Sequence, residues 1–141
     1  MKKKQVFGWG FAGILLIALF FGSCRQDTYD LPKYTEFVMQ IDSIQMPSTL
    51  KLGQSLKIKF YGTIGPDGCY VFSRFDPKAE GKTITVTAYG KHEEKSVCPD
   101  VISRLEGALL EVNLLDTGRY VVHVSQPSPP DIYDTVTVRT P

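Results

Sequence analysis

The segment from Leu114 to Ser125, which reads L-L-D-T-G-R-Y-V-V-H-V-S, constrains the fold more than any other part of the chain. Its centre, Asp116-Thr117-Gly118, consists of turn-forming residues, so the segment predicts the end of one strand and the start of another. After the turn, Tyr120, Val122 and Val124 alternate with other side chains and therefore share one face of the second strand. This stretch thus predicts β-structure on both sides of a tight turn.

Further strand patterns recur along the chain at regular intervals, separated by turn residues, as is typical of an all-β sandwich or barrel. In one of them Leu56, Ile58 and Phe60 alternate with lysines, which indicates one buried and one solvated face. No window has sustained helical periodicity. The segment 97–107 is left open between an extra strand and a helical turn. The predicted strands are 36–44, 55–61, 69–75, 82–89, 108–114, 118–125 and 132–139.

The spacing of Asp116, Gly118 and Tyr120 resembles the E–F corner of immunoglobulin-like sandwiches, where a tyrosine hydroxyl hydrogen-bonds back across the turn. The number of strands matches the constant-type immunoglobulin domain. Phe60 and Val122 stand where antibody domains have their inter-sheet cysteines, so the resemblance implies an apolar contact there. The chain is similar to bacterial immunoglobulin-like domains, which implies an all-β sandwich of about seven antiparallel strands in two sheets over residues 34–141, preceded by an N-terminal apolar signal segment.

The N-terminus predicts a secretory signal peptide over residues 1–23, because basic residues precede an apolar run from Val6 to Phe21. The end of this segment, Gly22-Ser23-Cys24, resembles the lipobox of bacterial lipoproteins. This resemblance implies that Cys24 carries acyl chains such as palmitate, with residues 24–33 as a tether. An uncleaved anchor is the alternative, but 16 apolar residues span about 24 Å as a helix, less than the ~30 Å hydrocarbon core. A simple secreted protein is the other alternative.

All three interpretations of the N-terminal segment predict that the domain lies outside the cytoplasm. Gram-negative lipoproteins that stay in the inner membrane often have an aspartate directly after the lipidated cysteine. This chain has Arg25 at that position. The resemblance therefore implies an outer-membrane lipoprotein of the cell envelope. Its periplasmic or surface-facing orientation is left open.

The net charge of +1 includes Lys2, Lys3 and Lys4; without them the chain has 13 basic and 15 acidic residues, for a net charge of −2. This balance does not indicate a nucleic-acid partner, which would need a basic face.

Cys69 and Cys98 remain once Cys24 is assigned to lipid, and two cysteines in an exported protein are predicted to form a disulfide. The resemblance to an A-to-G sandwich gives the same result, since it brings the B–C, D–E and F–G connections to one end. That end would hold both cysteines and the loop Gln126–Pro130. Two free thiols are the alternative.

Sequence motifs for catalysis or metal binding are weak. His92, Glu93, Glu94 and Cys98 form the one cluster of metal-ligand types, but the run lacks a second histidine at helical spacing, so no metal site is predicted. No G-x-S-x-G nucleophile motif occurs. Paired carboxylates for glycoside hydrolysis need only spatial proximity and stay open. The sequence therefore favours a protein that is not an enzyme and has no cofactor.

Three tyrosines at strand ends, Tyr61, Tyr89 and Tyr133, are the candidate binding surface, since aromatic rings can stack on sugars. Alternatively, they close the rim of the core. The leading hypothesis is a membrane-anchored extracytoplasmic module that binds a protein or polysaccharide partner without catalysis. The second hypothesis is a structural or assembly subunit of a cell-envelope complex. Three tyrosines in one patch would favour a glycan, and a long open edge strand would favour assembly.

Overall fold

The computed structural model describes residues 31–141, and Pro32–Pro141 forms a compact unit. The predicted signal peptide, Cys24 and most of the tether lie outside the described residues. Residues 31–141 contain no helix with the length and apolar character that crossing a membrane requires. Their strands are β1 (Tyr34–Val38), β2 (Ser43–Gln45), β3 (Thr49–Lys51), β4 (Ser55–Gly65), β5 (Tyr70–Glu80), β6 (Thr83–Glu93), β7 (Ser103–Asn113), β8 (Gly118–Ser125) and β9 (Ile132–Arg139).

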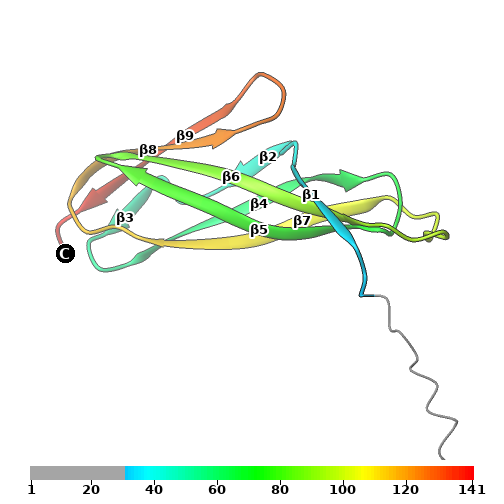
Figure 1. Ribbon diagram of the computed structural model, residues 1–141. Helices are drawn as coiled ribbons and strands as arrows, with labels where there is room; N and C mark the ends of the chain where they lie inside the picture. Colours follow the sequence, from blue (N-terminus) through cyan, green and yellow to red (C-terminus); the bar gives the residue numbers. More distant parts are fainter. Residues whose placement is uncertain (1–30) are drawn as a thin grey trace, which may run out of the picture. The chain divides into compact units, whose positions relative to one another are not determined.

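These strands form two sheets that pack face to face (Figure 1). The larger sheet has the order β1-β6-β8-β9-β3, with β5 also paired to β6, and the smaller sheet has the order β2-β4-β7. The two-sheet β-sandwich predicted from the sequence is confirmed. Most strand pairs are antiparallel, but β6 runs parallel to β8 and β3 runs parallel to β9.

The place of β6 differs from the constant-type immunoglobulin arrangement. There the fourth strand joins the sheet that holds the second and fifth strands. Here β6 lies in the larger sheet and pairs with β5 along almost its whole length. On its other side it pairs with β1 near its end and with β8 near its start. The long β5–β6 hairpin therefore extends the larger sheet and leaves the smaller sheet with three strands.

The single strand predicted over 36–44 is wrong, because the chain changes sheets in its middle. β1 pairs with β6 of the larger sheet, whereas β2 pairs with β4 of the smaller one. Between them Met39 and Ile41 are almost fully buried, so the crossing itself forms part of the core. The amide of Asp42 then donates to the carbonyl of Tyr61 at 2.9 Å and begins the second pairing. The short strand β3 lies outside the strands predicted from the sequence.

Both proposals for residues 97–107, an extra strand and a helical turn, are also wrong. Residues 103–107 are the first part of β7, which is longer than the predicted 108–114. The register with β4 shifts between Phe60 and Tyr61, opposite Gly107. Gly107 has φ = 75°, a left-handed conformation that glycine adopts without strain, so this is a β-bulge. The bulge shifts the alternation by one residue, which hid the continuity of the strand in the sequence.

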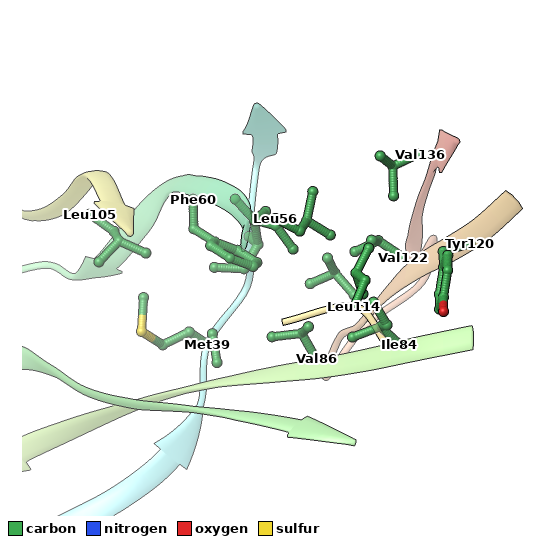
Figure 2. Packing of buried hydrophobic residues seen from close by; sticks show 14 of the residues in the cluster. Met39, Leu56, Phe60, Ile84, Val86, Leu105, Leu114, Tyr120, Val122 and Val136 are labelled. Carbon is green, nitrogen blue, oxygen red and sulfur yellow. The ribbon is translucent and has the colours of Figure 1, made fainter. Parts of the chain in front are cut away.

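The core lies between the sheets and, within the described chain, its side chains are apolar apart from the Tyr120 hydroxyl (Figure 2). The alternating faces of β4, β6, β8 and β9 supply most of it, as their sequence patterns predicted. Phe60 and Val122 are both fully buried, and the Phe60 ring packs on Phe75 with centroids 4.4 Å apart. The largest fully buried side chains are Phe60, Met39, Ile41, Leu56, Ile58, Ile84, Val86, Val122, Val124 and Val136.

Candidate functional site

The tyrosine corner has the geometry that its spacing predicted. Tyr120 is 5% exposed, and its hydroxyl donates to the carbonyl of Asp116 at 3.2 Å. The Lys82 ammonium donates to the same hydroxyl at 3.0 Å and to the carbonyl of Thr117 at 3.0 Å. Gly118 has φ = 124°, which a side chain would oppose. This set of contacts joins the β5–β6 turn to the β7–β8 turn and is scaffold.

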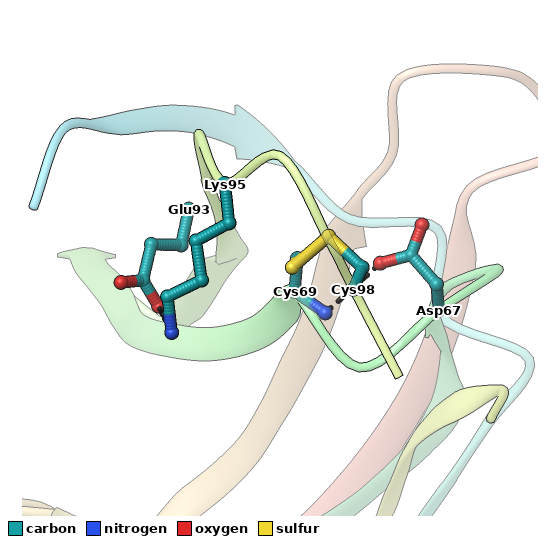
Figure 3. The surroundings of a disulfide bond; sticks show 5 residues. All are labelled: Asp67, Cys69, Glu93, Lys95 and Cys98. Carbon is teal, nitrogen blue, oxygen red and sulfur yellow. Dashed lines mark hydrogen bonds and ion pairs between the residues drawn. A yellow bond between two sulfur atoms is a disulfide. The ribbon is translucent and has the colours of Figure 1, made fainter. Parts of the chain in front are cut away.

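The predicted disulfide between Cys69 and Cys98 is confirmed, with the two Cα atoms 5.4 Å apart (Figure 3). The backbone reinforces it on both sides. The amide of Glu93 donates to the carbonyl of Cys69 at 3.0 Å, and the amide of Gly68 donates to the carbonyl of Pro99 at 2.9 Å. The disulfide thus ties the loop before β5 to the loop after β6.

The third loop predicted at the disulfide end, Gln126–Pro130, lies elsewhere, and that expectation is wrong. β8 ends at Ser125 opposite Thr87, well before the end of β6. The loop instead covers the crossing between β1 and β2, where the side-chain carbonyl of Gln126 accepts from the amide of Ile41 at 2.7 Å. The disulfide end holds the start of the folded domain, since the amide of Glu94 donates to the carbonyl of Lys33.

The structure does not bring the three candidate tyrosines into one patch. Tyr61 lies on β4 of the smaller sheet, whereas Tyr89 and Tyr133 lie on β6 and β9 of the larger sheet. All three alternate with core residues and so point away from the core, on opposite sides of the sandwich. A single three-tyrosine platform is therefore not formed.

The two tyrosines of the larger sheet each have one ring face covered by a neighbour. The Arg74 guanidinium lies 4.1 Å from the centre of the Tyr89 ring. The same Arg74 bonds Glu36 at 3.1 Å, and this hydrogen bond, followed by one from Ser73, lowers the pKa of the Glu36 carboxyl. Tyr133, 65% exposed, stacks on His123 with centroids 4.5 Å apart.

Tyr61 instead borders a shallow hollow of about 350 Å³ on the outer side of the smaller sheet. We call this outer side, formed by β2, β4 and β7, the small-sheet face. The Tyr61 hydroxyl donates to the side chain of Gln45 at 3.3 Å, which leaves its ring at the edge of the hollow. The hollow is lined by Asp42, Tyr61, Gly62, Thr63, Arg104, Leu105 and Glu106.

A second hollow of about 330 Å³ continues along the same face beyond Gln45. Its lining includes Lys57 and Lys59, and Lys57 pairs with Glu111 of β7 at 3.4 Å. The small-sheet face therefore carries both signs of charge, amide and hydroxyl groups, and one aromatic ring. Such a surface suits a polar ligand with many hydroxyls or a polar peptide. Among the described residues, this face holds no buried ionisable group of the kind that general acid–base chemistry commonly uses.

Comparison with known families adds an identification of the domain. The profile of the ORF11 beta-sandwich domain family matches residues 58–138, more than half of the 141-residue chain. The chain belongs to this family. The part matched to the ORF11 beta-sandwich domain runs from within β4 to within β9, so it includes the disulfide, the tyrosine corner and β7. It begins after β1, β2 and β3. No curated protein and no solved structure matches the chain.

Several residues of the small-sheet face of this ORF11 beta-sandwich domain were missed by sequence reasoning. Arg104 and Glu106 belong to the part of β7 that the predicted strand 108–114 does not include, and Asp42 lies at the crossing within the predicted strand 36–44. The alternation of Arg104, Glu106 and the buried Leu105 was the available signal. It was obscured by the bulge at Gly107.

The metal-ligand residues that lie near His92 differ from those that the sequence suggested. Glu93 pairs with Lys95 at 2.7 Å and Glu94 pairs with Lys33 at 2.8 Å, so both carboxylates are engaged by lysines. Asp67, which sequence reasoning did not include, lies with His92 and Cys98 instead. Asp67 precedes Cys69 by two residues, and that spacing was the signal that could have found it.

Proposed function

We propose that this ORF11 beta-sandwich domain is a membrane-anchored extracytoplasmic binding module of the cell envelope, without catalytic activity. Its partner is a polysaccharide or a protein, and its binding surface is the small-sheet face. The observation that carries the proposal is the hollow around Tyr61, where a ring lies beside carboxylate, guanidinium and hydroxyl groups. Aromatic rings beside a few polar groups are common in sites that bind amphipathic ligands.

The proposed location rests on two further features. The Cys69–Cys98 disulfide is typical of proteins in oxidising compartments. The resemblance of residues 1–24 to a lipoprotein signal supports an acylated Cys24, expected in the outer membrane. Labelling of cells with a palmitate analogue tests the anchor: the wild-type protein should be labelled, and the Cys24→Ser protein should not. Label on the Cys24→Ser protein would contradict lipidation at this cysteine.

The binding proposal is tested with the purified protein and fractionated envelope polysaccharides and proteins. Tyr61→Ala and Arg104→Ala should each weaken binding of a retained fraction by about tenfold or more, as central contacts do. Tyr133→Ala removes an exposed tyrosine from the opposite side of the sandwich and is the matched control. Equal loss with Tyr133→Ala, or none with Tyr61→Ala, would remove the small-sheet face from the proposal.

The second candidate function, an assembly subunit, is favoured by the free edge of β7. Within residues 31–141 this strand pairs with β4 on one side only, and its Leu109 is 47% exposed. β5 is also an edge strand, but it carries Pro77 and Lys78, which disfavour strand addition. Leu109→Lys should abolish a complex formed by strand addition at β7 and leave binding at Tyr61 intact, as read by cross-linking in cells. A cross-linked complex unaffected by Leu109→Lys would argue against this edge.

A further inference from the structure

Three side chains with metal-ligand atoms, joined by a fourth through a disulfide, lie at the disulfide end of the domain. Asp67, His92 and Cys98 each place one ligand atom within 4.8 Å of the other two. Cys69 is bonded to Cys98, so its sulfur is adjacent to one of these three ligand atoms. The disulfide sulfurs are not thiolates, and only the thiolate is an effective metal ligand. The cluster therefore has its full ligand set only after reduction.

The surrounding backbone keeps the two cysteines close without the sulfur–sulfur bond. The hydrogen bond from Glu93 to the carbonyl of Cys69 holds one cysteine against the end of β6. The hydrogen bond from the amide of Gly68 to the carbonyl of Pro99 holds the residue after Cys98 against the residue before Cys69. Because these bonds do not involve sulfur, reduction leaves two thiols side by side.

The other two side chains are also held in place. One carboxylate oxygen of Asp67 accepts from the amide of Cys69 at 2.9 Å, which orients the carboxylate beside the disulfide (Figure 3). One Asp67 carboxylate oxygen lies within 4.8 Å of the ligand atoms of both His92 and Cys98. The His92 ring lies against the Tyr70 ring with centroids 4.4 Å apart. Ligands fixed by a second layer of contacts bind metal with less reorganisation.

We propose that reduction of the Cys69–Cys98 disulfide converts this cluster into a zinc site with Asp67, Cys69, His92 and Cys98 as ligands. A dithiol reductant supplies two electrons and two protons and becomes a disulfide, while the two cysteines become thiols. Zn²⁺ then replaces both thiol protons, which pass to solvent. Two thiolates, an imidazole and a carboxylate are ligands that Zn²⁺ takes in tetrahedral geometry, with bonds of about 2.0–2.3 Å. The site and the disulfide exclude each other.

Cobalt(II) is the probe, because its visible spectrum reports tetrahedral coordination and thiolate bonds. The full-length protein is purified in detergent without a polyhistidine tag and titrated with Co²⁺ before and after treatment with a dithiol. The reduced protein should develop tetrahedral and thiolate–cobalt bands that an equivalent of Zn²⁺ abolishes. The oxidised protein should develop none. Strong bands in the oxidised protein, or none in the reduced protein, would overturn the proposal.

Variants separate this site from two cysteines that bind metal in an unfolded chain. His92→Ala and Asp67→Asn should each weaken Co²⁺ binding by more than the 10–100-fold that loss of a supporting group typically costs. His123→Ala, which alters the other histidine of the chain, should bind like the wild type. Zn²⁺ should also raise the thermal midpoint of the reduced wild-type protein, since a ligand of the folded state stabilises it. Equal affinities in all variants, or an unchanged midpoint, would contradict the proposal.

Discussion

The ammonium of Lys82 lies 3.0 Å from the Tyr120 hydroxyl and 4.3 Å from the centre of its ring. Lys82 lies in the β5–β6 turn and Tyr120 lies in β8, and the Tyr120 hydroxyl also donates to the carbonyl of Asp116. One tyrosine thus fixes two turns at the end of the sandwich that is opposite the disulfide. We therefore expect the tyrosine corner to contribute to the free energy of unfolding of the domain.

Tyr120→Phe should lower the free energy of unfolding by about 1–3 kcal/mol, because it removes both hydrogen bonds of a largely buried hydroxyl. Urea unfolding followed by circular dichroism measures the change. Tyr133→Phe is the control, since Tyr133 is largely exposed and its substitution should change stability little. Equal midpoints for Tyr120→Phe and the wild type would show that the corner hydroxyl is dispensable.

Gly62→Ala should destabilise the domain by about 1–3 kcal/mol, the usual cost of overpacking. A Cβ atom at Gly62 would lie 2.8 Å from the carbonyl oxygen of Gln40 in the crossing between β1 and β2. This neighbour is backbone and cannot rotate away. The same urea measurement applies, with the exposed Thr63→Ala in the same strand as control. A wild-type midpoint for Gly62→Ala would mean that the crossing can shift.

Removal of the disulfide by Cys69→Ser with Cys98→Ser should cost about 3–4 kcal/mol, from the chain-entropy estimate for a loop of this length. Thiol titration of the denatured, unreduced wild-type protein should detect neither cysteine. One reactive thiol per chain from this pair would contradict a stable disulfide. Chemical denaturation of the double variant without added metal measures the stability.

The loop between β8 and β9 should lose stability in acid through Asp131. Its pKa is lowered below the ordinary value of 3.8, first by the hydrogen bond with His123 and then by that from the amide of Gln126. A carboxyl with a depressed pKa stabilises the fold above its unfolded value, and this contribution is lost as pH falls through the lowered pKa. The stabilisation is therefore complete above about pH 4 and disappears below it.

The measurement is the thermal midpoint of the wild type and of Asp131→Asn as the pH is lowered. The wild type should be the more stable of the two above pH 4, and the difference should shrink in more acidic buffers. Asp100→Asn, at an exposed position in the loop after β6, should give no such trend. A constant difference between wild type and Asp131→Asn at every pH would separate this carboxylate from the acid response.

The sequence predicted the parts of the fold that depend on local alternation and turn chemistry. Leu56, Ile58 and Phe60 are buried as their spacing indicated, and Tyr120 makes the predicted hydrogen bond. The disulfide followed from the compartment and from the positions of the cysteines. Each of these inferences needed only neighbours along one strand or a count of cysteines.

Features that depend on which strands pair could not be predicted in the same way. The segment 36–44 has one apolar pattern, yet its two halves join different sheets because Met39 and Ile41 fill the space between the layers. The bulge at Gly107 shifted the alternation of β7 and hid the polar residues of the small-sheet face. The separation of Tyr61 from Tyr89 and Tyr133 likewise followed from sheet membership, which no local pattern specifies.

The crossing between β1 and β2 has a mechanical consequence. Tension that pulls Lys33 outward, beyond the disulfide end of the domain, acts along the axis of β1. The backbone hydrogen bonds between β1 and β6 are then loaded together in shear. Beyond β1, Met39 and Ile41 would have to leave the core before force could reach β2. Tension between Lys33 and the rest of the domain is therefore resisted at β1 by several backbone hydrogen bonds that must break together.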